Sequence, residues 1–170
     1  PIILPMCVAR FCCDLFGSHK LHVTLSKAHH THSHTHTHTH SHTHTHTHTS
    51  HSCLFQIIRT EEFQERTVQD IADQVRERLG AGPVYISVDI DVLDPAHAPA
   101  TGTPEVGGIN TREFFAVLRR LKGLNIVGSD VVEVAPAYDH AGVTGLAAAH
   151  TAWELLTLMG LPSEEATTGK

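Results

Sequence analysis

Several features that would define a class of protein are missing from this 170-residue sequence. It has no CxxC pair, and two of its four cysteines, Cys12 and Cys13, are adjacent, so neither a zinc-finger spacing nor a disulfide framework is present. No apolar run approaches the roughly 18–20 residues of a membrane span. The apolar run over residues 1–17 is interrupted by Pro5, Arg10 and Asp14 and makes a poor signal peptide. The cysteine pattern favours a reducing compartment, in the cytoplasm or a mitochondrion, and because the chain starts at Pro1 we expect the true N-terminus to lie upstream.

Basic residues are scarce in most of the chain. Residues 53–170 contain nine Lys and Arg residues against 17 Asp and Glu, whereas residues 1–52 contain three against one. A nucleic-acid surface requires a clustered basic face, so the acidic part argues against nucleic acid as a partner. It is compatible with a small cationic ligand, because a negatively charged cleft raises the local concentration of cations.

Histidine is abundant only in residues 1–52, which hold 14 of the 17 histidines, and residues 31–50 alternate histidine with threonine or serine. A strand of this composition would have two polar faces and nothing to drive its packing. We therefore expect residues 1–52 to be a disordered, low-complexity segment. Closely spaced imidazoles chelate Zn²⁺, Ni²⁺ or Cu²⁺, so metal sequestration is one functional interpretation. Another is a mis-assigned exon or retained intron, because a CA dinucleotide repeat read in frame encodes alternating His and Thr.

The patterning of residues 53–162 is that of a globular unit, followed by a polar tail over 163–170. Apolar periodicity predicts strands over 54–58, 84–88 and 125–136, and helices over 63–79, 111–122 and 143–159. This alternation predicts an α/β fold with a parallel sheet. Continuous apolar strands are typical of sheets covered on both faces. We therefore interpret the chain as the C-terminal part of a larger doubly wound parallel sheet.

Three aspartates end the stretch VYISVDIDVLDP, residues 84–95. Ligands of open α/β sheets bind at the carboxyl ends of the strands, and residues two apart in an extended chain point the same way. We therefore expect Asp89 and Asp91 to face one site, where carboxylate oxygens suit hard cations such as Mn²⁺ or Mg²⁺. The alternative is that they only cap a neighbouring turn. Asp94 is expected to be a turn former, and the long loop over 92–110 to be functional.

The wider stretch SVDIDVLDPAHAPATGTPEVGG, residues 87–108, resembles the C-terminal signature of the arginase/agmatinase (ureohydrolase) family. That signature is Ser-x-Asp-x-Asp, three residues, Pro, three residues, Pro with Gly, Ser or Ala, seven residues, and Gly. It is matched without a gap by Ser87, Asp89, Asp91, Pro95, Pro99, Ala100 and Gly108. The block GSDVVEVAPAYDHAG, residues 128–142, resembles the family's late strand and loop, in a form nearer to agmatinases than to arginases. The resemblance runs from about Phe55 to Gly160.

The resemblance implies an arginase-like α/β hydrolase with a pair of Mn²⁺ ions at the carboxyl edge of the sheet. Asp89 and Asp91 match two of the family's metal ligands, Glu133 matches the acid that holds the substrate guanidinium, and Thr103 matches a loop position lining the pocket. The implied reaction is manganese-dependent hydrolysis of a guanidino compound, most simply agmatine to putrescine and urea, by enzymes that form homo-oligomers. The residue types suit this reaction, because a planar guanidinium pairs bidentately with a carboxylate.

Other family motifs do not occur in the sequence: a Gly-Gly-Asp-His block, an Asp-Ala-His-x-Asp block and the segment with the proton-shuttling histidine. The chain is therefore expected to be a truncated form that carries two metal ligands, has no identified catalytic residue and is inactive alone. Two alternatives stay open. One is another ureohydrolase, of the arginase, guanidinobutyrase or formiminoglutamase type, and the other is a non-catalytic metal-binding fragment.

Overall fold

A four-stranded sheet forms the centre of the protein, whose structure is a computed structural model describing residues 7–11, 24–27 and 57–162. The strands lie in the order β2-β1-β3-β4, and β1, β3 and β4 run parallel while β2 joins the edge antiparallel. The parallel strands and the helices between them confirm the predicted α/β class. The strands are β1 Cys7–Phe11, β2 Thr24–Lys27, β3 Val84–Asp89 and β4 Ile126–Val132.

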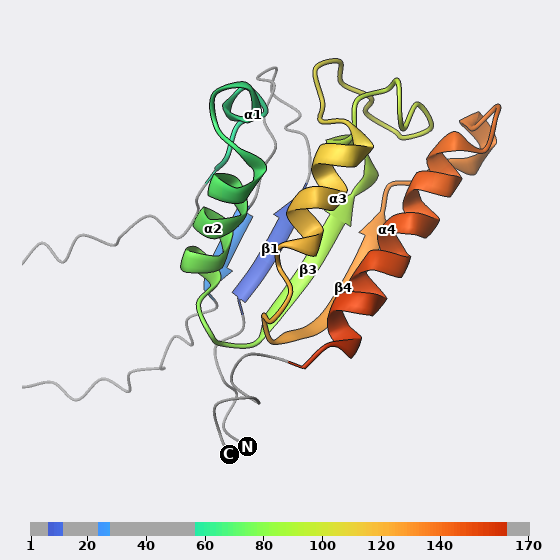
Figure 1. Ribbon diagram of the computed structural model, residues 1–170. Helices are drawn as coiled ribbons and strands as arrows, with labels where there is room; N and C mark the ends of the chain where they lie inside the picture. Colours follow the sequence, from blue (N-terminus) through green and yellow to red (C-terminus); the bar gives the residue numbers. More distant parts are fainter. Residues whose placement is uncertain (1–6, 12–23, 28–56, 163–170) are drawn as a thin grey trace, which may run out of the picture.

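Three helices lie against one face of the sheet, in front of it in Figure 1. The helices are α2 Val68–Leu79, α3 Thr111–Arg119 and α4 Val143–Gly160, with the short helix α1 Glu62–Glu65 before them. The 3-10 turns η1 (Ile90–Val92) and η2 (Pro136–Tyr138) come shortly after β3 and β4. The helices begin near the edge of the sheet where the parallel strands end, so strand ends, helix N-termini and loops share that edge (Figure 1). No helix in the described part of the chain has both the length and the apolarity to cross a membrane.

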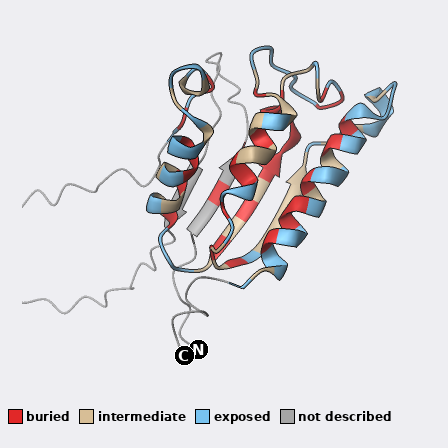
Figure 2. Cartoon of the chain, in the orientation of Figure 1, coloured by how far each residue is buried: buried red, intermediate tan, exposed pale blue. Residues whose placement is uncertain are grey.

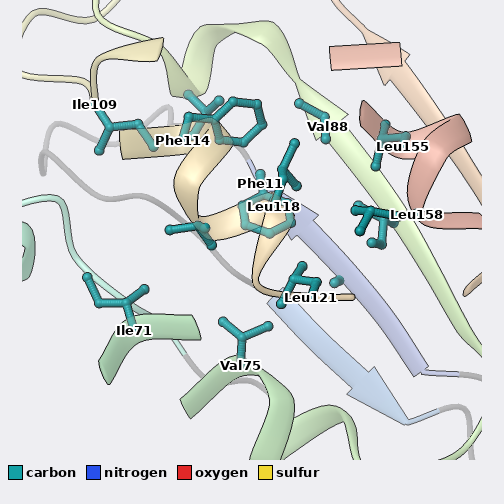
Figure 3. Packing of buried hydrophobic residues seen from close by; sticks show 14 of the residues in the cluster. Phe11, Ile71, Val75, Val88, Ile109, Phe114, Leu118, Leu121, Leu155 and Leu158 are labelled. Carbon is teal, nitrogen blue, oxygen red and sulfur yellow. The ribbon is translucent and has the colours of Figure 1, made fainter. Parts of the chain in front are cut away.

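The hydrophobic core fills the space between the sheet and the helices (Figures 2 and 3). Val84, Ile86 and Val88 of β3 are fully buried, because alternate residues of a strand face the same side. Phe114 of α3 packs edge-on against Phe11 of β1, with 5.8 Å between the ring centroids. Helical spacing in the sequence predicts an apolar face on α2, and of its members Val68 is partly buried while Ile71, Ala72, Val75 and Leu79 are buried.

Strands β1 and β2 lie in the segment that composition predicted to be disordered. β1 pairs in parallel with β3 from Cys7↔Val84 to Phe11↔Val88, and the side chains of Ala9 and Phe11 are fully buried. The prediction of disorder does not hold for these two short segments. The prediction extended the composition of the histidine–threonine tract to the residues around it. The segment CVARF, however, has apolar residues that can face a core. Its backbone also supplies hydrogen-bond partners for one edge of β3. The tract itself lies outside the described residues.

The single helix predicted over 63–79 is two helices, α1 and α2, separated by a break at Arg66 and Thr67. Both residues have extended backbone, and Thr67 caps α2: its hydroxyl accepts from the Asp70 amide at 3.2 Å while the Asp70 carboxylate accepts from the Thr67 amide at 3.0 Å. This reciprocal cap satisfies two backbone amides at the start of α2 that have no hydrogen-bond partner within the helix. The pair Thr67 and Asp70 was the overlooked signal.

The strand predicted over 54–58 is not seen in its described residues. Ile57 and Ile58 have irregular backbone, although Ile58 is buried in the core, and residues 54–56 lie outside the described part. The strand predicted over 125–136 exists, but β4 ends at Val132, before the loop that carries Glu133.

Asn110 and Glu113 have the three-residue spacing of a capping box at the start of the predicted helix over 111–122, and the structure confirms the cap. The Asn110 side chain accepts from the Glu113 amide at 2.9 Å, and the Glu113 carboxylate accepts from the Asn110 amide at 3.4 Å. Together the two contacts fix the first turn of α3 and end the loop that begins at the acidic strand end.

Replacing Asn110 with alanine is expected to lower the free energy of unfolding by about 1 kcal/mol, because the cap contact is lost while the helix is kept. Urea unfolding followed by circular dichroism measures the change. Asn110→Asp serves as the matched control, since aspartate caps as well as asparagine does. An equal loss in both variants would contradict the capping explanation.

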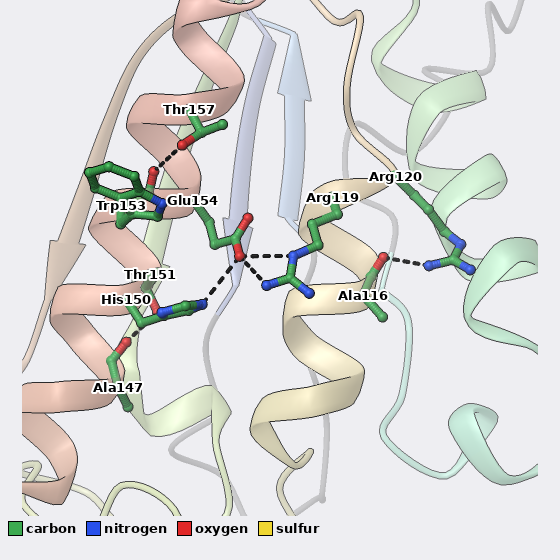
Figure 4. Close-up of polar contacts among 9 residues, drawn as sticks. All are labelled: Ala116, Arg119, Arg120, Ala147, His150, Thr151, Trp153, Glu154 and Thr157. Carbon is green, nitrogen blue, oxygen red and sulfur yellow. Dashed lines mark hydrogen bonds and ion pairs between the residues drawn. The ribbon is translucent and has the colours of Figure 1, made fainter.

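A buried acid joins α3 to α4 (Figure 4). The Glu154 side chain is 10% exposed, accepts from the Arg119 guanidinium and lies 3.2 Å from His150 Nε2. The hydrogen bond from Arg119 is the main cause that lowers the pKa of Glu154. Glu154 is the only charged residue of α4, so this contact fixes the rotation of the helix and, with it, the position of its first turn.

Candidate functional site

The candidate site lies at the edge of the sheet where β3 and β4 end next to each other, with Asp89 paired to Val132. Asp89 is the last residue of β3 and Asp91 lies in η1; they are 6% and 4% exposed. Two carboxylates at this depth are expensive unless positive charge or hydrogen bonds compensate them. The position matches the general location of ligand sites in parallel α/β sheets.

The chain brings Asp89 and Asp91 together by a turn, not by strand alternation. β3 ends at Asp89, and the Asp91 amide donates to Asp89 Oδ1 at 3.3 Å within the 3-10 turn. The two acids lie next to each other as expected, while the geometric reason given for it was wrong. The Asp89 side chain therefore caps the turn and also remains next to the Asp91 charge.

The electrostatic environment of Asp89 is strongly unfavourable to its charged form. Burial, followed by the neighbouring charge of Asp91, raises the pKa of Asp89 from 3.8 to about 7. The charge of Glu133 adds to the effect, so this carboxylate is near enough to disfavour the charged form of Asp89. Three acids that share one field make the site a strong attractor for cations.

Thr103 and Glu133 complete the group of predicted site residues. The Thr103 hydroxyl donates to Asp91 Oδ2 at 3.2 Å. Glu133 approaches the same loop: a Cβ atom added to Gly102 would lie 3.7 Å from Glu133 Oε2. The structure thus brings Asp89, Asp91, Thr103 and Glu133 together at one end of the sheet, although they span 45 positions of the sequence.

Glu133 has a left-handed backbone, with φ 62°, the only positive φ among the described non-glycine residues. A residue with a Cβ atom pays roughly 1–3 kcal/mol for a sparsely populated backbone conformation, and such strain concentrates at functional sites. In an unbroken strand, Glu133 and Asp130, three residues apart, would point to opposite sheet faces. Asp130 lies in β4 and accepts from the Tyr85 hydroxyl at 3.0 Å, but Glu133 lies beyond β4, so its own φ sets its direction.

Asp94 is confirmed as a turn former. Its two carboxylate oxygens accept from the Ala96 amide at 2.9 Å and the Gly107 amide at 2.8 Å, and the Ala96 contact is the main cause that lowers its pKa. These bonds hold the start of the 92–110 loop against its end. Gly108 is required there, because a Cβ atom would lie 2.4 Å from the Asp94 nitrogen.

Three polar residues near the site were missed from sequence. Asp139 accepts from the Thr144 amide at 3.2 Å and the Gly145 amide at 2.8 Å, and so caps α4 from outside the helix. The fully buried Thr144 hydroxyl accepts from the Ala100 amide at 2.9 Å. The Thr101 hydroxyl is buried and finds no partner within the described residues. Even Asp139 lacks the usual capping spacing, because it lies three residues before Gly142, the N-cap of α4.

The described donors fit part of a metal site. Across residues 7–11, 24–27 and 57–162, no three His, Cys, Asp or Glu side chains are grouped to hold a metal ion. Asp89 and Asp91 offer hard oxygen ligands, which suit Mn²⁺, and their mutual repulsion is the property that a cation would relieve. Two carboxylates are fewer than a pair of hard cations requires.

The fold and the paired acids define an α/β protein with a cation-attracting site at the carboxyl edge of its sheet. The model of the Arginase family matches residues 17–158, and the chain belongs to this family. Members are hydrolases of guanidino compounds and, in general, binuclear manganese enzymes.

Proteins with similar sequences and structures agree with this assignment. An agmatinase of Photorhabdus laumondii is 50% identical over 104 residues, which cover 61% of this chain and 34% of the relative. A guanidinopropionase of Pseudomonas aeruginosa is 46% identical over 110 residues, 65% of this chain and 35% of the relative. The solved proclavaminate amidino hydrolase of Streptomyces clavuligerus has a TM-score of 0.58 and 50% identity, covering 60% of this chain and 35% of that one. The chain thus spans about a third of the length of these relatives.

Proposed function

We propose that this chain carries the C-terminal part of a manganese-dependent ureohydrolase active site, with agmatine as substrate and putrescine and urea as products. The observation that carries the proposal is the grouping of the buried acids Asp89 and Asp91 with the strained Glu133 at one sheet edge. The agmatinase relatives support the choice of agmatine, and the putrescine product assigns the protein to polyamine metabolism.

Asp89 and Asp91 would hold the metal. Each is more than nine-tenths buried, so a bound cation offsets a desolvation cost that the free carboxylates carry. Manganese, when bound, supplies Lewis acidity that activates water for attack near neutral pH. Thr103 donates to Asp91 Oδ2 and thereby orients the carboxylate that would bind the metal, a typical contribution of a residue behind a ligand.

Glu133 would hold the substrate. Its carboxylate can accept two parallel hydrogen bonds from a guanidinium, which fixes both the position and the plane of that group. Placing the guanidinium carbon beside the metal ligands uses proximity to lower the barrier. The left-handed backbone at Glu133 ends the extended path of β4, and its carboxylate lies near Gly102 of the loop that carries Thr103.

The remaining metal ligands are proposed to come from sequence outside this chain, so the chain alone is expected to be inactive. A test of function therefore transplants residues 84–160 into the Photorhabdus laumondii agmatinase in place of its matching segment. The chimera is expected to release urea from agmatine in the presence of Mn²⁺. Asp91→Asn within the transplanted segment should reduce the rate by at least about a hundredfold, because a metal-ligand carboxylate is lost.

The matched control is Asp73→Asn in α2 of the 170-residue chain, where the same chemical change falls on an exposed residue. Mn²⁺ binding followed by electron paramagnetic resonance should weaken in Asp91→Asn and remain unchanged in Asp73→Asn. A chimera that folds and binds Mn²⁺ but turns over guanidinobutyrate instead of agmatine would assign the site to a sibling ureohydrolase. Metal uptake that is unaffected by Asp91→Asn would support a non-catalytic metal-binding fragment and overturn the proposal.

A further inference from the structure

We propose that Thr144 is a positioning residue for the substrate acid: its buried hydroxyl fixes the segment 100–103 against the segment 133–135 and so sets the place of Glu133. The inference rests on the proposed function, because it assigns Thr144 a role through the Glu133 site. Thr144 is fully buried in the first turn of α4 and belongs to neither the metal ligands nor the substrate contacts described above.

The first step of the connection runs from α4 to the loop. The Thr144 hydroxyl accepts from the Ala100 amide at 2.9 Å, across 44 positions of sequence. A buried backbone donor needs a partner, so loss of this acceptor leaves the Ala100 amide unsatisfied. The contact therefore holds the strand-like segment that leads into Gly102 and Thr103.

The second step runs from the loop to the substrate acid. The Ala100 carbonyl accepts from the Ala135 amide at 2.9 Å, and Thr101 forms an antiparallel bridge with Val134. Glu133 directly precedes these two bridged residues and has the strained φ of 62°. A strained backbone conformation persists only where the surrounding structure holds it in place. Among the described residues, the contacts of Ala100 and Thr101 with Val134 and Ala135 hold the chain directly after Glu133.

The third step fixes α4 itself. Asp139 accepts from the amides of Thr144 and Gly145, so the turn that carries the hydroxyl is tied to the loop after η2. At the helix middle, Glu154 and Arg119 prevent α4 from rotating over α3. The hydroxyl of Thr144 is thus presented by a rigid element, as precise positioning requires.

Thr144→Val tests the role, because valine keeps the shape and removes the acceptor. In the 170-residue chain, hydrogen exchange at the Ala100 and Ala135 amides should become at least about tenfold faster. In the Mn²⁺-loaded chimera, Thr144→Val should raise the KM for agmatine at least about fivefold, while the Kd for Mn²⁺ stays within about twofold because Asp89 and Asp91 are untouched. Thr144→Ser, which keeps the hydroxyl, should restore all three values.

Thr151→Val is the matched control: Thr151 is also a fully buried threonine of α4, but its hydroxyl donates to the Ala147 carbonyl of its own helix at 2.8 Å (Figure 4). It should leave both amides and the KM for agmatine unchanged. Unchanged exchange at Ala135 in Thr144→Val, or equal effects of Thr144→Val and Thr151→Val, would overturn the positioning role. If the chimera does not hydrolyse agmatine, the proposed function fails, and the exchange rates in the 170-residue chain alone then decide whether Thr144 holds the loop.

Discussion

Replacing Phe11 with alanine is expected to lower the free energy of unfolding by about 3–5 kcal/mol, the usual cost of removing a fully buried aromatic ring. Phe11 is 0% exposed and its ring packs edge-on against Phe114 of α3. The truncation would leave a cavity between β1 and α3 at the centre of the core. The effect would be large in comparison with the total stability of a domain of this size.

The experiment separates two descriptions of the first part of the chain. If residues 7–11 form a central strand, urea unfolding of Phe11→Ala shifts strongly to lower denaturant. If they are disordered, as composition predicted, the change is close to zero. Leu146→Ala is the control, because Leu146 is 72% exposed and its truncation should change the free energy of unfolding by no more than about 0.5 kcal/mol.

Local signals predicted most of the fold after residue 57. The runs VYISV and NIVGSDVV contain β-branched residues without helical spacing, and both became strands, while Asn110 with Glu113 marked the start of α3. The pairing of β1 with β3 could not be predicted in this way. It joins Cys7 to Val84 across 77 positions, and such a contact depends on a free strand edge that only the folded sheet presents.

The sequence suggested the members of the candidate site but not their geometry. The resemblance to the ureohydrolase signature pointed to Asp89, Asp91, Thr103 and Glu133, and the fold brings these four residues to one edge. The turn that joins the two aspartates and the left-handed backbone of Glu133 were not visible, since strand alternation was assumed to continue past the strand ends. The hydroxyl of Thr144 was missed because a threonine in an apolar helix gives no signal until its long-range partner is known.

Replacing Asp89 with asparagine is expected to stabilise the metal-free chain by about 2–4 kcal/mol at pH 8. The pKa of Asp89 is raised from 3.8 to about 7 by burial and by the Asp91 charge. Raising the pKa of Asp89 by about three units corresponds to about 4 kcal/mol of stability lost by the charged form. The lower limit of about 2 kcal/mol allows for the Asp91 side chain moving away from the charged Asp89. Asparagine keeps the size of the side chain and removes the charge that burial disfavours.

The direction of the pH dependence follows from the raised pKa. The folded chain binds the Asp89 proton more tightly than the unfolded chain, so this contribution to stability is fully present below about pH 4 and is lost as the pH rises to about 7. Asp89→Asn should therefore differ little from the wild type at pH 4 and exceed it at pH 8. Thermal melts with a chelator, at pH values between 4 and 8, measure the difference, and Asp73→Asn in α2 should show no such pH-dependent gain.

Adding Mn²⁺ is expected to reverse the order of the two proteins. A cation that binds only the folded state stabilises it by RT ln(1 + [L]/Kd), so wild-type chain at pH 8 should gain stability as Mn²⁺ is raised. Asp89→Asn has lost a ligand and the charge that Mn²⁺ would neutralise, so its melting temperature should stay constant. If Asp89→Asn is more stable without metal and its melting temperature does not respond to Mn²⁺, then Asp89 binds the metal and lowers the stability of the metal-free chain. If Asp89→Asn instead destabilises the metal-free chain at pH 8, the capping bond to the Asp91 amide outweighs the cost of burying the charge.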